Sequence, residues 1–417
     1  MKSLTAAIVA LGCAAAVFAE PEITALTVSQ NSSRVVTIDF TLSEKAIVTL
    51  DMTTNGVSIG PDNYRLIQDA QSDSIDYPAN KVLSAGRHVF MWRATKDWPN
   101  HIFNNGEFAV DLKAFSLSSP PDYMVVDLTT KSNRWFYASV DDLPYGGIKT
   151  ADSSDAVAVA ELTNDIYRTT KLVMRRIPAA GNKWRMGSPT TESNRNASEV
   201  PHYVTLTEDY YISIYPLVKW QSHVVAKDSA YDIIPYNNIS YRAWRGTPSA
   251  SAYNWPDNGH DIDPDKPMQK FRNYTGLKLD FPTEAQWEYA CRAGISGPYN
   301  NGASTGSDVG WSQSNATKMM PVGLLKPNAW GLYDMHGNIW EWCLDQFQTH
   351  PSTPQIDPEG ATNNMSDRVV KGGTYKTWLL HGRSAARRGE SSSVGSDSGF
   401  SGPIGIRLCC PITGVAE

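Results

Sequence analysis

From Pro327 to Cys343 the chain reads PNAWGLYDMHGNIWEWC. This stretch places three tryptophans, one tyrosine and two carboxylates around glycines that favour turns. So dense a group of special-purpose residues marks a candidate functional segment. Trp340 and Trp342 alternate as in an extended segment, and aromatic residues at such spacing are more often core than ligand platform.

A short helix is predicted upstream, in FPTEAQWEYACRAG from Phe281 to Gly294. Thr283 and Gln286 have the spacing of a capping box, and glycine at the end of the segment is a typical helix stop. Trp287 and Cys291 are four residues apart and are expected to face the core. The residues expected to face solvent are Glu284, Glu288 and Arg292.

The N-terminal third carries two further patterns. Residues 1–19 contain Lys2 and an apolar run from Ala6 to Phe18, which is the layout of a secretory signal. They predict cleavage near Ala19 and export to the periplasm, the cell surface or the medium. Residues 20–128 alternate apolar and polar side chains in short runs separated by turn signals, and predict an immunoglobulin-like β-sandwich.

The rest of the chain divides into a linker and a second domain. Residues 129–165 mix polar turns with the segments PYGG and DSSD and are predicted to be a linker. Residues 166–417 are predicted to form the second domain. No stretch after the signal reaches the ~20 apolar residues that a membrane-spanning helix needs.

Charge and cysteine content limit the classes of function. The formal net charge is −6, with both signs dispersed, which argues against a nucleic-acid-binding surface. Four cysteines remain after removal of the signal, and an oxidising compartment permits either disulfides or buried free thiols. These cysteines are Cys291, Cys343, Cys409 and Cys410.

A third stretch, RVVKGGTY from Arg368 to Tyr375, follows the first two. The three occur in an order that resembles the formylglycine-generating enzyme, or sulfatase-modifying factor, family. The segments WRMGSP (184–189), EVPHYVTL (199–206) and YYISIYP (210–216) match the opening of the same domain. The resemblance implies an irregular α+β fold related to C-type lectins for the second domain.

Two carboxylates form a candidate calcium site. Asp334 and Glu341 are seven residues apart across a glycine-containing turn, so two carbonyls can fold between them, and Ca²⁺ binds such oxygen ligands. The resemblance assigns structural calcium to the side chains of these two residues and to the carbonyls of Gly337 and Ile339. The alternative is that Asp334 caps a turn and Glu341 pairs with an arginine.

Copper is not expected. The resemblance places the family's two copper-binding cysteines three and eight residues after Thr374, where this chain has Thr377 and Gly382. No cysteine lies between Cys343 and Cys409. Cu(I) requires soft thiolate ligands, which a hydroxyl and a glycine do not supply.

The same segments supply candidates for a binding pocket. Trp340 matches a tryptophan that lines the family's active cleft, and the segment after the glycine pair adds Thr374, Thr377, His381 and Arg383. Iron chemistry would require histidines, of which His336 and His381 lie near the expected cleft. Several arginines of the C-terminal segment could hold a carboxylate, a sulfate or a peptide, or could simply pair with acids of the domain. These arginines are Arg383, Arg387, Arg388 and Arg407.

Three functions follow from these patterns. The first is an exported family member that binds a protein, peptide or glycan ligand without copper-dependent oxidation of cysteine. The second is an enzyme of the same fold with different oxidative chemistry, such as that of non-haem iron. The third is a sulfatase-activating formylglycine generator, against which the missing cysteines argue.

Overall fold

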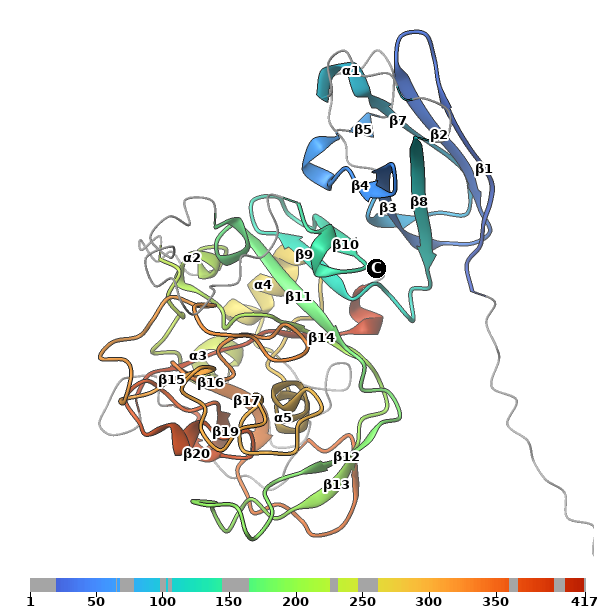
Figure 1. The fold of residues 1–417 in the computed structure, drawn as a ribbon. Helices are drawn as coiled ribbons and strands as arrows, with labels where there is room; N and C mark the ends of the chain where they lie inside the picture. The colour runs from blue at the N-terminus through green and yellow to red at the C-terminus, as the bar shows by residue number, and fades with distance from the viewer. Residues whose placement is uncertain are drawn as a thin grey trace, which may run out of the picture.

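The computed structural model describes residues 20–64, 66–67, 79–97, 103, 107–144, 165–225, 232–246, 262–359, 367–393 and 402–415. The predicted signal and most of the predicted linker lie outside these residues. The described chain is a mixed structure of many short strands and few helices, arranged as a smaller N-terminal unit and a larger C-terminal unit (Figure 1).

The N-terminal unit consists of two antiparallel sheets around one apolar core. Phe40 and Phe90 from the first sheet pack edge to face at 5.2 Å between ring centroids, and Met52 of the second sheet is fully buried in the same cluster. The predicted alternation is confirmed in β2. The first sheet runs β1 (Ile23–Gln30), β2 (Val35–Leu42), β7 (Gly86–Arg93), β5 (Leu66–Ile67), and the second contains β4 (Val57–Ser58), β3 (Ala46–Thr54), β6 (Lys81–Leu83) and β8 (Phe108–Phe115).

The boundary between the units lies earlier than predicted. β9 (Tyr123–Asp127) falls within the predicted sandwich and β10 (Arg134–Tyr137) within the predicted linker, yet both belong to the sheet of the second unit. β9 pairs antiparallel with β11 (Lys171–Ile177), from Lys171 opposite Asp127 to Arg175 opposite Tyr123. The physical reason is that every residue of β9 is buried, as in a strand covered on both faces.

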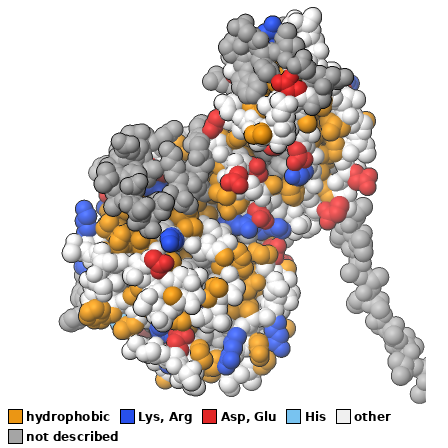
Figure 2. All heavy atoms as spheres, viewed as in Figure 1, with side chains coloured by type: hydrophobic (Ala, Val, Ile, Leu, Met, Phe, Trp, Pro, Cys, Tyr) orange, Lys and Arg blue, Asp and Glu red, His pale blue; other side chains and the backbone are white. Residues whose placement is uncertain are grey.

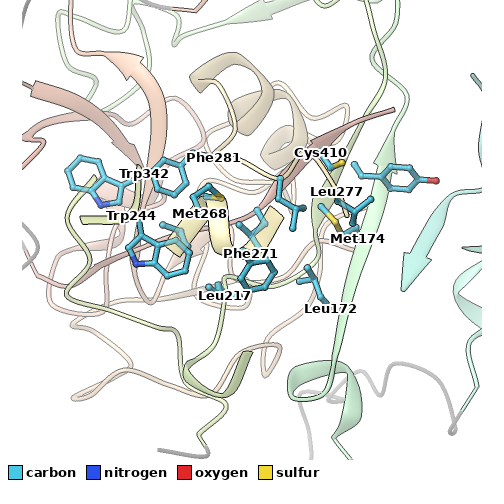
Figure 3. Packing of buried hydrophobic residues seen from close by; sticks show 14 of the residues in the cluster. Leu172, Met174, Leu217, Trp244, Met268, Phe271, Leu277, Phe281, Trp342 and Cys410 are labelled. Carbon is cyan, nitrogen blue, oxygen red and sulfur yellow. The ribbon is translucent and has the colours of Figure 1, made fainter. Parts of the chain in front are cut away.

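The central sheet of the second unit has five strands in the order β10-β9-β11-β14-β22, with β14 at Tyr210–Ser213 and β22 at Cys409–Pro411. Apolar clusters cover both of its faces, because Leu172 and Met174 of β11 enter one cluster and Val173 enters the other. Figure 3 shows the first cluster, in which Phe271 and Met268 from α4 (Pro267–Thr275) lie against the sheet.

Smaller elements complete the two units. A second sheet, β20-β19-β17-β21, contains the end of the stretch from Pro327 to Cys343, because β17 begins at Trp340. Its strands are β17 (Trp340–Gln346), β19 (Asp367–Lys371), β20 (Arg388–Ser391) and β21 (Ile404–Gly405). The other elements are β12 (Lys183–Met186), β13 (His202–Thr205), β15 (Gly310–Trp311), β16 (His336–Gly337), β18 (Gln355–Ile356), α1 (Ala94–Asp97), α2 (Lys219–Ser222), α3 (Tyr241–Arg245), α5 (Glu284–Arg292) and short 3-10 turns, among them η5 (Leu379–Gly382).

Helix α5 confirms its predicted cap but not its predicted surface. Thr283 accepts a hydrogen bond from the Gln286 amide, and the Thr283 amide donates to the Gln286 side chain at 2.8 Å. Trp287 and Cys291 are fully buried, as expected. The expectation that Glu284, Glu288 and Arg292 face solvent is wrong, since all three are also buried.

Buried cations explain why these charges tolerate the interior. Lys371 Nζ of β19 lies 3.1 Å from Glu288 Oε2, Arg292 lies 2.8 Å from the other Glu288 oxygen, and Arg387 lies 2.6 Å from Glu284. Lys371 and Arg292 hold the pKa of Glu288 at about 2 against the effect of burial, which acts in the opposite direction. The helix is therefore enclosed on all sides.

The two units contact each other through β10. The Phe136 amide donates to the Asn80 carbonyl at 2.8 Å, and Lys81 Nζ lies 5.7 Å from the centre of the Trp135 ring. Ile47 of β3 is buried in an apolar cluster of the second unit. Acidic and basic side chains are interspersed on the face seen in Figure 2. None of the helices in the described ranges has the length and apolar character needed to cross a bilayer.

Candidate functional site

The segment 334–341 folds as a tight turn that depends on left-handed backbone. Asp334, Gly337 and Asn338 have φ values of 56°, 88° and 63°. A Cβ on Gly337 would lie 1.8 Å from the Trp311 carbonyl oxygen, so only glycine fits there. The Gly337 amide donates to the Gly372 carbonyl at 2.6 Å, which joins this turn to the glycine pair that follows β19.

Glu341 is fully buried and is held by two partners. Arg407 donates to both of its carboxylate oxygens at 2.9 Å, and Trp287 Nε1 donates to Oε2 at 2.6 Å. Arg407 also donates to the carbonyls of Ser213 and Tyr333, at 2.9 and 2.8 Å. The structure thus contains the predicted alternative in which Glu341 pairs with an arginine.

Asp334 is buried, and among the described residues only one of its two carboxylate oxygens has a hydrogen-bond donor. Its Oδ2 accepts from the Gly323 amide at 2.7 Å, whereas Oδ1 has no hydrogen-bond partner among the described residues. Burial raises the pKa of this carboxyl to about 6. The unused Oδ1 fits a hard cation, but both Glu341 oxygens already accept from Arg407, so the four calcium residues fit the ion only in part. Calcium at Asp334, Gly337, Ile339 and Glu341 stays a prediction.

The substitution Asp334→Asn tests this charge balance. The pKa of Asp334 in the fold is raised from 3.8 to about 6, so ionisation above pH 6 opposes folding and the penalty is absent below pH 4. We expect the neutral amide to raise the free energy of unfolding by about 2 kcal/mol at pH 8 in EDTA, measured by urea denaturation. Asparagine also tolerates left-handed φ.

The expected gain should fade as the pH falls from 6 to 4. The exposed Glu208→Gln serves as a matched control and should change the free energy of unfolding by less than about 0.5 kcal/mol. A stability gain from added calcium that Asp334→Asn abolishes would instead identify this carboxylate as a calcium ligand. Equal stability of Asp334→Asn and wild type at pH 8 would contradict the charge argument.

A cavity of about 430 Å³ brings together four of the five predicted pocket residues, Trp340, Thr377, His381 and Arg383. Thr374 lies outside the lining, because its buried hydroxyl donates to the Asn338 carbonyl at 3.2 Å. The other residues that line the cavity are Asn194, Arg195, Asn196, Glu199, Leu380, Ala386, Arg387 and Arg388.

Three of the predicted arginines form ion pairs at this cavity. Arg383 contacts both Glu192 and Glu199, with its Nη2 at 2.9 Å from Glu199 Oε1. Arg388 lies 2.6 Å from Glu390 and has a side chain that is 39% exposed. As described above, Arg387 pairs with Glu284. The predicted alternative of ion pairing therefore holds for all three.

Of the two histidines considered for iron, His381 lines the cavity and His336 does not. His336 is fully buried, with Nδ1 2.7 Å from the Gly382 carbonyl and Nε2 accepting from the Asn300 amide at 3.1 Å. Burial lowers its pKa to about 4. Both ring nitrogens are therefore engaged, so His336 offers no lone pair to a metal. Within the described ranges, no three His, Cys, Asp or Glu residues group closely enough to hold a metal ion.

The cysteines are free thiols buried in the core. None of the four has measurable exposure, and within the part of the chain that the structure describes none pairs in a disulfide. Burial raises the pKa of the Cys291 and Cys410 thiols to about 12. The position of the family's second copper cysteine, Gly382, is closely packed, since a Cβ there would lie 2.9 Å from the Gly372 carbonyl.

Several residues at the cavity were not predicted. Asn194, Arg195 and Asn196 come from a loop that gave no sequence signal beyond its place between two matching segments. Trp378 follows the lining residue Thr377 directly; it does not line the cavity itself but is 58% exposed, which is unusual for so large an apolar residue. A tryptophan next to polar residues is the sequence signal that could have identified Trp378 as an exposed aromatic residue.

Comparisons with known proteins find a matching family model and similar sequences. A family model described as "Sulfatase-modifying factor enzyme 1-like domain" matches residues 177–409. The formylglycine-generating enzyme of Mus musculus is 36% identical over 149 residues, and that of Streptomyces coelicolor is 30% identical over 155 residues. The matched parts cover 30% and 33% of this chain and 39% and 48% of those enzymes, so the chain spans less than half of either.

Two solved structures are also similar. Treponema denticola variable protein 1 has a TM-score of 0.44 and PvdO from Pseudomonas aeruginosa one of 0.45, each at 21% identity. Each alignment covers 58% of this chain, and 95% and 94% of those chains. The family match itself extends from the end of β11 to β22 and includes the tight turn, helix α5 and the cavity. The chain therefore belongs to the sulfatase-modifying factor enzyme 1-like family, to which the formylglycine-generating enzymes are similar.

Proposed function

We propose that the mature chain is an exported sulfatase-modifying factor-like protein that binds a ligand in the cavity around Trp340, Thr377, His381 and Arg383, without copper-dependent oxidation of cysteine. The N-terminal unit, as an immunoglobulin-like sandwich, presents a second unit with the irregular, C-type-lectin-like fold that the resemblance implies. The ligand is a partner protein, peptide or glycan rather than nucleic acid.

One observation carries this proposal. At the two positions where the resemblance places copper thiolates, the chain has a hydroxyl and a glycine. The Thr377 hydroxyl donates to the Thr374 carbonyl at 3.0 Å, and Gly382 packs against backbone where no side chain fits without a shift. The nearest cysteines in sequence, Cys343 and Cys409, are core thiols, and burial raises the pKa of both. A protonated buried thiol is a poor ligand for Cu(I).

The cavity itself suits ligand binding without this oxidation. A volume of about 430 Å³ lies within the range typical of sites for small ligands and peptide side chains. Its wall combines an aromatic ring, a hydroxyl, an imidazole and several guanidinium groups, which can orient a polar ligand. The alternative of iron chemistry is less well supported, because His336 has both ring nitrogens engaged.

An oxidation assay tests the proposal. The purified mature chain is incubated with Cu(I), O₂ and a peptide containing Cys-x-Pro-x-Arg, and the peptide is followed by mass spectrometry. We expect no conversion of the thiol to an aldehyde, because no thiolate pair is available at the cavity. The Streptomyces coelicolor enzyme serves as a positive control. Catalytic conversion by this chain would overturn the proposal.

A further inference from the structure

The cavity contains an arginine that no acid neutralises. Within the part of the chain that the structure describes, Arg195 donates through Nε to the Ser188 hydroxyl and through Nη2 to the Glu199 carbonyl, both at 3.2 Å, and has no carboxylate partner. It lines the cavity and is partly exposed. A guanidinium group in this state is suited to a carboxylate, which it can bind through two parallel hydrogen bonds.

Two arginines act on His381 at the cavity. The pKa of this half-exposed imidazole is lowered, first by burial and then by the charges of Arg383 and Arg388. Arg383 and Arg388 are themselves paired with glutamates, so Arg195 is the arginine whose charge a ligand can meet most directly.

The rim also presents groups that suit a polypeptide. Asn196 is exposed and uses Oδ1 to accept from the Ser198 amide, which leaves its amide nitrogen as a donor at the cavity. Trp378 is not part of the cavity lining, but it directly follows Thr377, which is, and it is largely exposed. The Gln313 side-chain amide is oriented so that both its oxygen and its nitrogen have hydrogen-bond partners. In this orientation its oxygen accepts from Trp378 Nε1 at 2.8 Å, which fixes the exposed ring in place. A fixed aromatic ring contributes contact area at low entropic cost.

We propose that this cavity recognises an acidic peptide segment, with a side-chain carboxylate bound by Arg195 and the peptide main chain lying along Asn196 and Trp378. This inference rests on the proposed ligand-binding function and specifies its ligand class. The side-chain amide of Asn196 can donate to a peptide carbonyl. The guanidinium of Arg195, which has no carboxylate partner among the described residues, can bind a carboxylate of the same peptide. A uronate-containing glycan shares the carboxylate but not the peptide group.

Fluorescence anisotropy at low ionic strength tests this proposal with defined probes. The mature chain is titrated into fluorescein-labelled GEGEG, GQGQG and GKGKG peptides, and an oligogalacturonate is added as a competitor. We expect the acidic peptide to bind and the other two to bind at least about tenfold more weakly, because hydrogen bonds to charged groups are the stronger ones. Arg195→Gln should weaken binding of GEGEG about tenfold.

Arg185→Gln is the matched control, since it removes one exposed arginine from β12 outside the cavity lining. It should leave the affinity nearly unchanged, and Trp378→Ala should weaken binding of acidic and amide peptides alike. Equal affinity for GEGEG and GQGQG, or equal losses in Arg195→Gln and Arg185→Gln, would overturn the proposal. Tighter binding of the oligogalacturonate would replace it with a glycan ligand. None of these outcomes depends on the copper assay, which tests the proposed function separately.

Discussion

Arg407→Met is expected to lower the free energy of unfolding by about 4 kcal/mol, because removal of one partner leaves a buried charge uncompensated. Arg407 and Glu341 are both fully buried, and the guanidinium also satisfies two carbonyls of neighbouring segments. Methionine fills a similar volume, so the loss reports mainly the charge and the hydrogen bonds. Urea denaturation at pH 7 measures the effect.

Two further variants make this result specific. The double variant Arg407→Met/Glu341→Gln removes the stranded charge and should recover part of the stability that the single variant loses. Arg388→Met breaks an ion pair whose arginine is 39% exposed, and should cost less than about 1 kcal/mol. A small loss for Arg407→Met itself, below that of Arg388→Met, would show that another cation or solvent neutralises Glu341.

Gly337→Ala is the second substitution with a large expected effect. The added methyl group would meet the Trp311 carbonyl oxygen at 1.8 Å at a position with φ of 88°. We expect a loss of at least about 4 kcal/mol, in the range that marks a severe structural defect. The loss should appear in urea denaturation or as failure to accumulate in soluble form.

Gly294→Ala separates the steric clash of the added methyl group from the strain of the left-handed backbone. Gly294 has the same φ of 88°, but nothing lies within 4 Å of the Cβ position, so only the backbone strain remains. That strain should cost about 1–2 kcal/mol. Similar losses for the two alanine variants would refute the steric explanation for Gly337 and leave backbone conformation alone.

Much of the cavity could be predicted from sequence, because its residues lie within motifs. Trp340 was predicted from its match to a cleft tryptophan of the family, and Thr377, His381 and Arg383 from their positions after the glycine pair; the structure brings the four together. Arg195 was not predicted, since it comes from a loop far earlier in the chain and its role depends on which charges are left unpaired. Which charges are neutralised depends on contacts between segments that are far apart in the sequence.

The choice of ion-pair partners shows the same limit. Pairing of Glu341 with an arginine was a recognised alternative, but nothing local indicates that the partner is 66 residues away, at Arg407. Helical periodicity likewise failed for Glu284 and Glu288, because it assumes that one face of a helix is open to water. Helix α5 is enclosed by Lys371, Arg387 and the surrounding strands, so its charged face is internal.

The early boundary between the units has a practical consequence for dissecting this protein. The family match begins at Ile177, which is the last residue of β11, so an expression fragment cut there would lack β9, β10 and nearly all of β11. A fragment that started at residue 166 would keep β11 but leave its edge without the strand that covers it. Unpaired sheet edges promote self-association. Only a cut before Tyr123 preserves the whole sheet.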